Sequence, residues 1–240
     1  MSLLDDPQAC LALIEKSPTA VTAQDQQAWL SLFAKGAKVE DPVGSRPNIH
    51  DGDLQNGALA RFYKTFIEGN RIIFRVEQDI VQHGKVLRDL RMEIHMAEQV
   101  CVTVPMHLLY ELSEEQGELK IQRLAAHWEL SPMSKQLLSK GFAGFKVMVN
   151  NTFKMINHLG FSGILGFMQA RKHVGKKGKA ALEELIKQQF TEASVGKILT
   201  AGNTVSASLF DQHNHQHLGV VIAKIQASNY SVARADFYKT

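Results

Sequence analysis

Two neighbouring carboxylates, Glu40 and Asp41, are the residues best suited to acid–base chemistry, in the run VEDPVGS at 39–45. In an extended segment successive side chains point to opposite faces, so Glu40 and Asp41 cannot share a site. Asp41 instead shares its face with Val39 and Val43. A carboxylate on an apolar face is desolvated, which raises its pKa and makes it a stronger base. The alternative is that Asp41 faces water or caps the following turn.

A second candidate is a set of three histidines at alternate positions, His213, His215 and His217. On an extended chain their rings would point the same way, and three imidazoles suit zinc. The set lies between two strand-like runs, however, where a turn would scatter the rings. A polar hairpin loop is the preferred interpretation, and we predict no metal site.

The basic run at 171–179 lacks the glycine, lysine and hydroxyl spacing of a nucleotide-binding P-loop. It precedes a helical pattern, so a solvated helix entrance is the expectation. Binding of phosphate, anionic lipid or nucleic acid is the alternative.

The preceding Phe- and Met-rich stretch, 142–168, is expected to pack over the rest of the protein or in a dimer. A hydrophobic ligand, a partner helix or a membrane surface is its other interpretation.

Periodicity predicts the elements that position Asp41. Helical spacing of apolar residues is found at 7–16, 26–34 and 53–66, and Ser17-Pro18 would end the first of these helices. A short extended segment is expected at 38–43. Strict alternation of apolar and polar residues at 85–96 and 100–112 predicts antiparallel strands, flanked by strands at 72–81 and 119–130. This order of elements is typical of an α+β domain that ends near Pro132.

The remainder of the chain has a different pattern. Residues 134–168 and 176–190 are expected to be helical, and 204–210, 218–226 and 230–238 are expected to be strands. The last strand weakly resembles residues 121–128. The segment is therefore predicted to be a helical lid with three strands, or alternatively a degenerate second copy of the first fold.

The run at 39–45, Phe62-Tyr63 on the next helix and Val104-Pro105 in the strands resemble the bacterial ketosteroid isomerases. These enzymes belong to the nuclear-transport-factor-2-like, or SnoaL-like, superfamily, and the resemblance covers residues 7–130. It implies a cone-shaped, cystatin-like domain in which a curved antiparallel sheet wraps around helices and encloses an apolar pocket. In that family an Asp moves a proton beside a ketone while a Tyr and a protonated acid stabilise the oxyanion.

The resemblance assigns Asp41 as the general base and Phe62, Tyr63 and Trp128 as pocket residues. The oxyanion Tyr would fall near Ser17, and no Tyr precedes Tyr63. The acidic donor would lie just after Pro105, where this chain has Met106 and His107. We therefore expect His107 to act as a donor or as a second acid or base, since its ordinary pKa is near 6.5. Its alternative role is that of a hydrogen-bonded core histidine.

Composition excludes several classes of protein. The chain has 240 residues, of which 45% are hydrophobic and 21% charged, which excludes disordered and fibrous proteins. A net charge of +3 does not point to nucleic acid. The two cysteines cannot form a disulfide framework. The acidic N-terminus, without a long apolar segment after it, argues against a signal peptide. Polar and charged residues interrupt the apolar stretch 141–168 too often for it to span a bilayer. We therefore expect a cytoplasmic protein.

Together these observations predict a ketosteroid isomerase-like domain at 1–132 and a helical and β extension at 133–240. The predicted function is a small-molecule isomerase or cyclase without a cofactor, in which Asp41 and His107 act in one pocket with Phe62, Tyr63, Met106 and Trp128. The expected partners are a small hydrophobic carbonyl compound and a second copy of the chain, bound through the outer sheet face where such families dimerise. A non-catalytic carrier, or a module acting at a membrane or partner, is the alternative.

Overall fold

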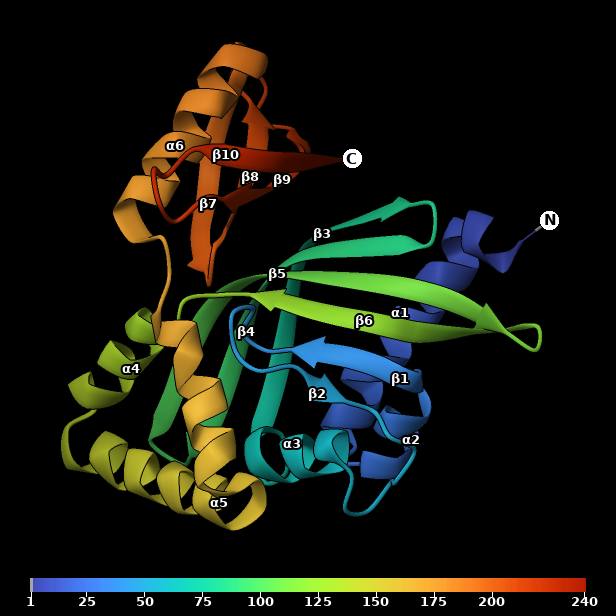
Figure 1. The fold of residues 1–240 in the computed structure, drawn as a ribbon, viewed down its shortest axis with the longest axis vertical. Coiled ribbons are helices and arrows are strands. Elements are labelled where there is room, and N and C mark those ends of the chain that lie inside the picture. Colours follow the sequence, from blue (N-terminus) through green and yellow to red (C-terminus); the bar gives the residue numbers. More distant parts are fainter. Residues whose placement is uncertain (1) are drawn as a thin grey trace.

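A computed structural model describes residues 2–240, and its first half contains a curved six-stranded sheet (Figure 1). The strand order is β2-β1-β6-β5-β4-β3. Strand β1 pairs in parallel with β6, and the other neighbours are antiparallel. The strands are β1 Phe33–Glu40, β2 Asn48–Ile49, β3 Arg71–Gln82, β4 Lys85–Ala97, β5 Val100–Glu115 and β6 Glu118–His127.

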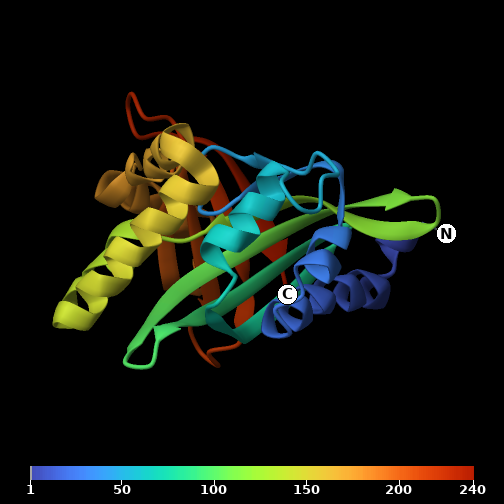
Figure 2. The same ribbon diagram turned by 90° about the horizontal axis from the view of Figure 1, so that it is seen from below.

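Five helices cover the inner face of this sheet, as the view from below shows (Figure 2). They are α1 Pro7–Thr22, α2 Gln26–Ser31, α3 Ala58–Phe66, α4 Leu130–Ser139 and α5 Gly141–Met168, and a 3-10 turn, Leu3–Asp5, precedes them. Asp6 caps α1 by accepting hydrogen bonds from the first-turn amides. The predicted α+β fold, with a curved sheet wrapped on helices, is confirmed.

Three predicted boundaries in this region were wrong. The helix predicted at 53–66 begins only at Ala58, with Gly57 as its N-cap. Helix α1 does not end at Ser17 but continues through Pro18 to Thr22. Burial of Ser17, Ala20 and Val21 against the core keeps the helix intact although Pro18 cannot donate a backbone hydrogen bond. The second helix ends at Ser31, and Phe33 already begins β1, because its backbone pairs with Ile121 of β6.

The second half contains an antiparallel sheet in the order β10-β9-β8-β7. Its strands are β7 Ala193–Ala201, β8 Thr204–Asp211, β9 His217–Ile225 and β10 Val232–Lys239, and it follows a 3-10 turn, Gln169–Arg171, and helix α6 Gly175–Gln189. The sequence predicted three strands here and missed β7. Its register shifts between Val195 and Ile198, which interrupts the alternation that would have marked it.

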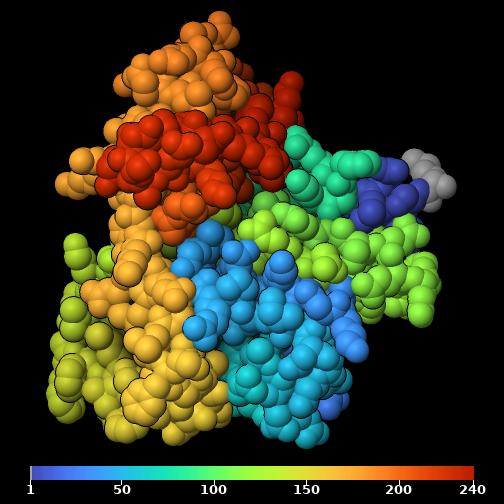
Figure 3. Space-filling view, in the orientation of Figure 1, coloured from blue at the N-terminus to red at the C-terminus, as the bar shows by residue number. Residues whose placement is uncertain are grey.

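The second sheet packs on the outer face of the first, and α6 covers its far side (Figure 1). A buried apolar cluster joins the two sheets through Ile80, Leu87, Leu109, Val220 and Ile222, among others. In the space-filling view the C-terminal elements, orange to red, form a lobe directly above the green strands (Figure 3). The outer face that we expected to form a dimer is therefore covered by the chain's own C-terminal segment, which corrects that expectation.

Two glycines mark a close backbone approach between the halves. Gly44 and Gly202 both have positive φ, and a Cβ added to Gly44 would lie 2.6 Å from Gly202 Cα. Only glycine has both the backbone freedom and the small size that this contact requires. The loop that follows Asp41 is thereby held against the second sheet.

Candidate functional site

A cavity of about 510 Å³ lies between the inner face of the first sheet and the helices. Its wall is mostly apolar and comes from α1, α3, α4, α5 and the strands, with Phe62, Phe74, Met92, Met106, Met148 and Phe167 among its side chains. A volume of this size suits a small organic ligand. Side chains of α4 and α5, among them Met133 and Met155, form one side of the cavity.

Asp41 and Trp128 meet in this cavity. They follow β1 and β6, which are parallel neighbours with Glu40 opposite Ala125, so both residues leave the sheet at the same end. Trp128 Nε1 donates a hydrogen bond of 2.5 Å to Asp41 Oδ1. Val39 shares the cavity wall with Asp41 as predicted, but Val43 does not, since it packs in the cluster between the sheets.

The environment of Asp41 makes it a base of intermediate strength. Desolvation disfavours its charged form and is the dominant effect, whereas the Trp128 hydrogen bond stabilises the carboxylate. The net result raises the pKa of Asp41 to about 6. The side chain keeps some accessible surface because it borders the cavity. A carboxylate with this pKa is ionised at neutral pH and accepts a proton more readily than a solvated one.

Hydroxyl donors enter the same cavity from two other elements. Ser17 of α1 lines it and accepts a hydrogen bond of 3.1 Å from Trp29 Nε1. Tyr110 of β5 also lines it, and its phenol interacts with Ser17. Burial raises the pKa of Tyr110 to about 12, so its hydroxyl keeps its proton and can donate it in a hydrogen bond.

Tyr110 is the residue that sequence reasoning missed. Ser17 occupies the α1 position where the resemblance implied a Tyr, and Tyr110 brings a phenol to the Ser17 hydroxyl from the sheet. The signal was present in the sequence, because Tyr110 alternates in phase with Met106 and Leu108 on β5. All three line the cavity.

The remaining predicted pocket residues divide into two groups. Phe62, Met106 and Trp128 line the cavity, as expected. Tyr63 does not: it packs on Trp29, with ring centroids 5.5 Å apart, and its buried hydroxyl has no hydrogen-bond partner. Neighbouring residues on a helix point about 100° apart, and here Phe62 faces the cavity while Tyr63 turns toward Trp29.

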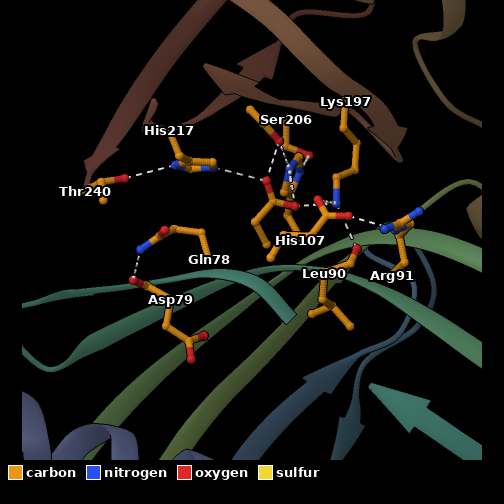
Figure 4. Close-up of polar contacts among 12 residues, drawn as sticks. Gln78, Asp79, Leu90, Arg91, His107, Lys197, Ser206, His217 and Thr240 are labelled. Atoms are coloured by element: carbon orange, nitrogen blue, oxygen red, sulfur yellow. Dashed lines mark hydrogen bonds and ion pairs between the residues drawn. The ribbon is translucent and has the colours of Figure 1, made fainter. Parts of the chain in front are cut away.

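His107 lies on the opposite side of the sheet from Asp41, which corrects the prediction that they share a pocket. Because β5 alternates, Met106 faces the cavity and His107 faces the second sheet. There its Nδ1 lies 2.7 Å from Ser206 Oγ and its Nε2 lies 2.9 Å from Ser208 Oγ (Figure 4). His107 is thus the hydrogen-bonded core histidine of the alternative interpretation, and burial lowers its pKa.

Asp89 is the charged centre of this polar cluster between the sheets. It is fully buried and forms an ion pair with Lys197, which also donates to the Leu90 carbonyl at 2.8 Å (Figure 4). Ser208 donates to Asp89 Oδ2 at 2.5 Å, and His217 Nε2 lies 3.2 Å from the same oxygen. Burial alone would raise the pKa of Asp89, but its histidine and lysine partners hold it well below its usual range.

The other sequence motifs are not brought together as a site. His217 reaches Asp89, whereas His213 and His215 are exposed in the β8–β9 turn. Across residues 2–240 no group of three His, Cys, Asp or Glu side chains is placed to hold a metal ion. A wider hollow of about 770 Å³ along α1 has only exposed or half-buried titratable side chains, such as Glu15 and Lys120. In the described part of the chain, no helix combines the length and apolarity needed to cross a membrane.

Comparison with known proteins finds no matching family model and no matching curated protein. Solved structures do match. One is the Δ5-3-ketosteroid isomerase of a Mycobacterium species, with 24% identity, a TM-score of 0.44, and coverage of 51% of this chain and 95% of that one. Another is a Mycobacterium tuberculosis protein in complex with estradiol-17β-hemisuccinate, with 20% identity, a TM-score of 0.44, and 51% and 95% coverage. A third is an LEH-like epoxide hydrolase of M. tuberculosis, with 14% identity, a TM-score of 0.44, and 59% and 96% coverage.

Proposed function

We propose that this chain is an enzyme that moves a proton next to the carbonyl group of a small hydrophobic compound. The observation that carries the proposal is Asp41, a carboxylate with a pKa of about 6 in an apolar cavity of about 510 Å³. A base of this kind suits removal of a weakly acidic carbon-bound proton. The surrounding Met and Phe side chains suit an apolar skeleton more than a charged one.

In the proposed reaction an Asp41 oxygen accepts a proton from the carbon beside the carbonyl. The electrons of that C–H bond form a carbon–carbon double bond, and the carbonyl π electrons move to oxygen to give an enolate. Asp41, now protonated, returns the proton to the same carbon, which gives α-proton exchange. In a β,γ-unsaturated ketone the enolate is a dienolate, and return of the proton to the γ carbon completes an isomerisation without a cofactor. The Trp128 hydrogen bond holds the carboxylate oxygen in place during both transfers.

The enolate oxygen requires a hydrogen-bond donor, and Tyr110 with Ser17 is our candidate for that role. Both hydroxyls line the cavity that contains Asp41. A neutral phenol in a desolvated wall donates strongly to a developing oxyanion. This assignment replaces His107, which lies behind the sheet.

The test is exchange of α-protons for deuterium on a panel of cyclic ketones, followed by NMR. Wild type is expected to accelerate exchange, and Asp41→Asn to abolish the acceleration. Asn keeps the size and the acceptor oxygen for Trp128 but is not a base. Equal rates for wild type and Asp41→Asn would remove Asp41 from the mechanism.

A non-catalytic carrier is the second candidate. One observation favours it: Asp41 is the only carboxylate among the described residues lining the cavity, and no histidine lines it. Native mass spectrometry of the purified protein tests this candidate. A retained apolar ligand, together with no exchange activity on any ketone, would support a carrier.

A further inference from the structure

The outer side of α4 and α5 exposes large apolar side chains to solvent. Among residues 2–240, large hydrophobic side chains that are more than half exposed occur only between 138 and 165. Phe142 is 83% exposed, Phe161 77% and Leu165 69%, and Leu138, Phe145 and Phe153 complete the set. Scattered single exposures are ordinary on protein surfaces, but a concentration of this kind indicates an interaction site.

Helical geometry places three of these side chains in one row. Phe145 follows Phe142 by three residues, and Phe153 follows Phe145 by eight, so the three side chains project from the same face of α5. We call these three residues the outer Phe row. Another side of the same helix is also apolar, since Met148 and Met155 line the cavity. In the view from below, the yellow α5 runs along the surface of the molecule (Figure 2). The fold therefore uses one apolar face of α5 and leaves the other without a partner.

The charged side chains carried by α4 and α5 themselves all have the same sign, and the basic stretch continues along the chain into α6. Residues 131–182 contain nine Lys and Arg and no Asp or Glu. The other residues of the chain contain the remaining 18 Lys and Arg against all 24 Asp and Glu, so they are net acidic. Exposed Lys140 and Lys146 lie next to Phe142 and Phe145 along α5. The small net charge of the whole protein conceals this asymmetry.

We propose that the outer face of α5 docks on an anionic lipid surface. Phe and Leu side chains with lysines between them form the pattern of a helix that lies in the membrane interface. Lysines near the surface are attracted to anionic headgroups. A second copy of this chain fits the row less well, because the lysines that flank the row on each copy would repel each other. In a docked molecule α5 alone separates the cavity from the lipid. The docking does not depend on the proposed proton transfer.

The experiment is flotation of the full chain with vesicles of phosphatidylcholine alone or with about one quarter phosphatidylglycerol, at low and high salt. Wild type is expected to float with the anionic vesicles at low salt and far less at high salt. Replacing the outer Phe row, F142S/F145S/F153S, is expected to reduce binding at least about tenfold, since it removes the inserted apolar area. K140Q/K146Q is expected to reduce binding to anionic vesicles about thirtyfold without affecting neutral ones.

Matched controls are substitutions of the same kind elsewhere on the surface. K16Q/K224Q removes two exposed lysines outside 131–182, and L54S removes an exposed apolar side chain outside α5. Both are expected to bind like wild type, and circular dichroism confirms that every variant is folded. No flotation of wild type with anionic vesicles, or equal binding by F142S/F145S/F153S, overturns the proposal. A dimer in sedimentation velocity that this triple variant loses, without vesicle binding, would assign the row to a second copy instead.

Discussion

Trp128 and Asp41 come from the ends of two parallel neighbouring strands and join through a 2.5 Å hydrogen bond at the wall of an apolar cavity. Burial acts against the charge of Asp41, and the indole N–H acts in its favour. These two opposed effects set the pKa of the carboxylate near 6. The acid strength of the proposed base is thus controlled by a residue 87 positions away in the chain.

The proposed proton transfer is expected to depend on pH through Asp41. The carboxylate must be ionised to accept a proton, so the exchange rate should fall as pH decreases through about 6. Trp128→Phe removes a donor that favours the ionised form and should move this midpoint upward by about one pH unit. Trp29→Phe is the matched control, because Trp29 donates to Ser17 and not to Asp41. A midpoint near pH 4 in wild type, the value of a solvated carboxylate, would contradict the prediction.

Tyr110→Phe is expected to reduce the exchange rate by about a hundred- to a thousandfold, the usual effect of losing one oxyanion donor. Its matched control is Tyr63→Phe, which removes a buried hydroxyl that makes no hydrogen bond. That variant should keep its activity and be at least as stable as wild type, since no hydrogen bond is lost. The measurements are the exchange rate at saturating ketone and thermal unfolding. Similar rate losses in both variants would show that a general disturbance, not the Tyr110 hydroxyl, is responsible.

The Asp89–Lys197 pair between the sheets is expected to be costly to break from one side. Lys197→Met leaves the Asp89 carboxylate buried without its lysine partner and should lower the free energy of unfolding by about 2–4 kcal/mol. Neutralising both residues, as in Asp89→Asn with Lys197→Met, should recover most of that loss. Urea unfolding of the two single variants and the double variant measures the coupling. Additive losses in the double variant would exclude a coupled pair.

Stability is expected to decrease in mild acid because two histidines are buried between the sheets. The pKa of His127 is lowered to about 3, chiefly by burial, and that of His107 is lowered for the same reason. Below about pH 6.5 the unfolded chain binds protons that the folded chain excludes, so folding becomes less favourable as pH falls. Each such histidine contributes a slope of up to about 1.4 kcal/mol per pH unit.

The measurement is urea unfolding at several pH values between neutral and about 4.5. His127→Gln should reduce the slope, whereas His213→Gln, on the exposed β8–β9 turn, should leave it unchanged. Asp41, whose pKa is raised to about 6, acts in the opposite direction below that pH, so the comparison with the variant decides. An unchanged slope in His127→Gln would mean that His127 is accessible to protons in the folded protein.

Local pattern predicted the first half of the fold well. Alternation on β4 and β5 identified the antiparallel strands, and the run at 39–45 directed attention to Asp41, which does line the cavity. The failures occurred where burial overrides a local signal. Helix α1 continues past Pro18, and β7 forms although its register is broken, because in both cases neighbouring elements cover the segment.

The sequence by itself determined which side chains share a strand face: Met106, Leu108 and Tyr110 on one side of β5, and His107 on the other. It could not determine what covers each face. That depends on how the C-terminal sheet packs behind the first sheet, a contact between residues about 100 positions apart, such as His107 with Ser206 and Ser208. Only the tertiary structure placed His107 in a buried polar cluster, and only it brought Tyr110 to the cavity of Asp41. Alternation is a local property of the backbone, whereas the environment of each face is set by long-range packing.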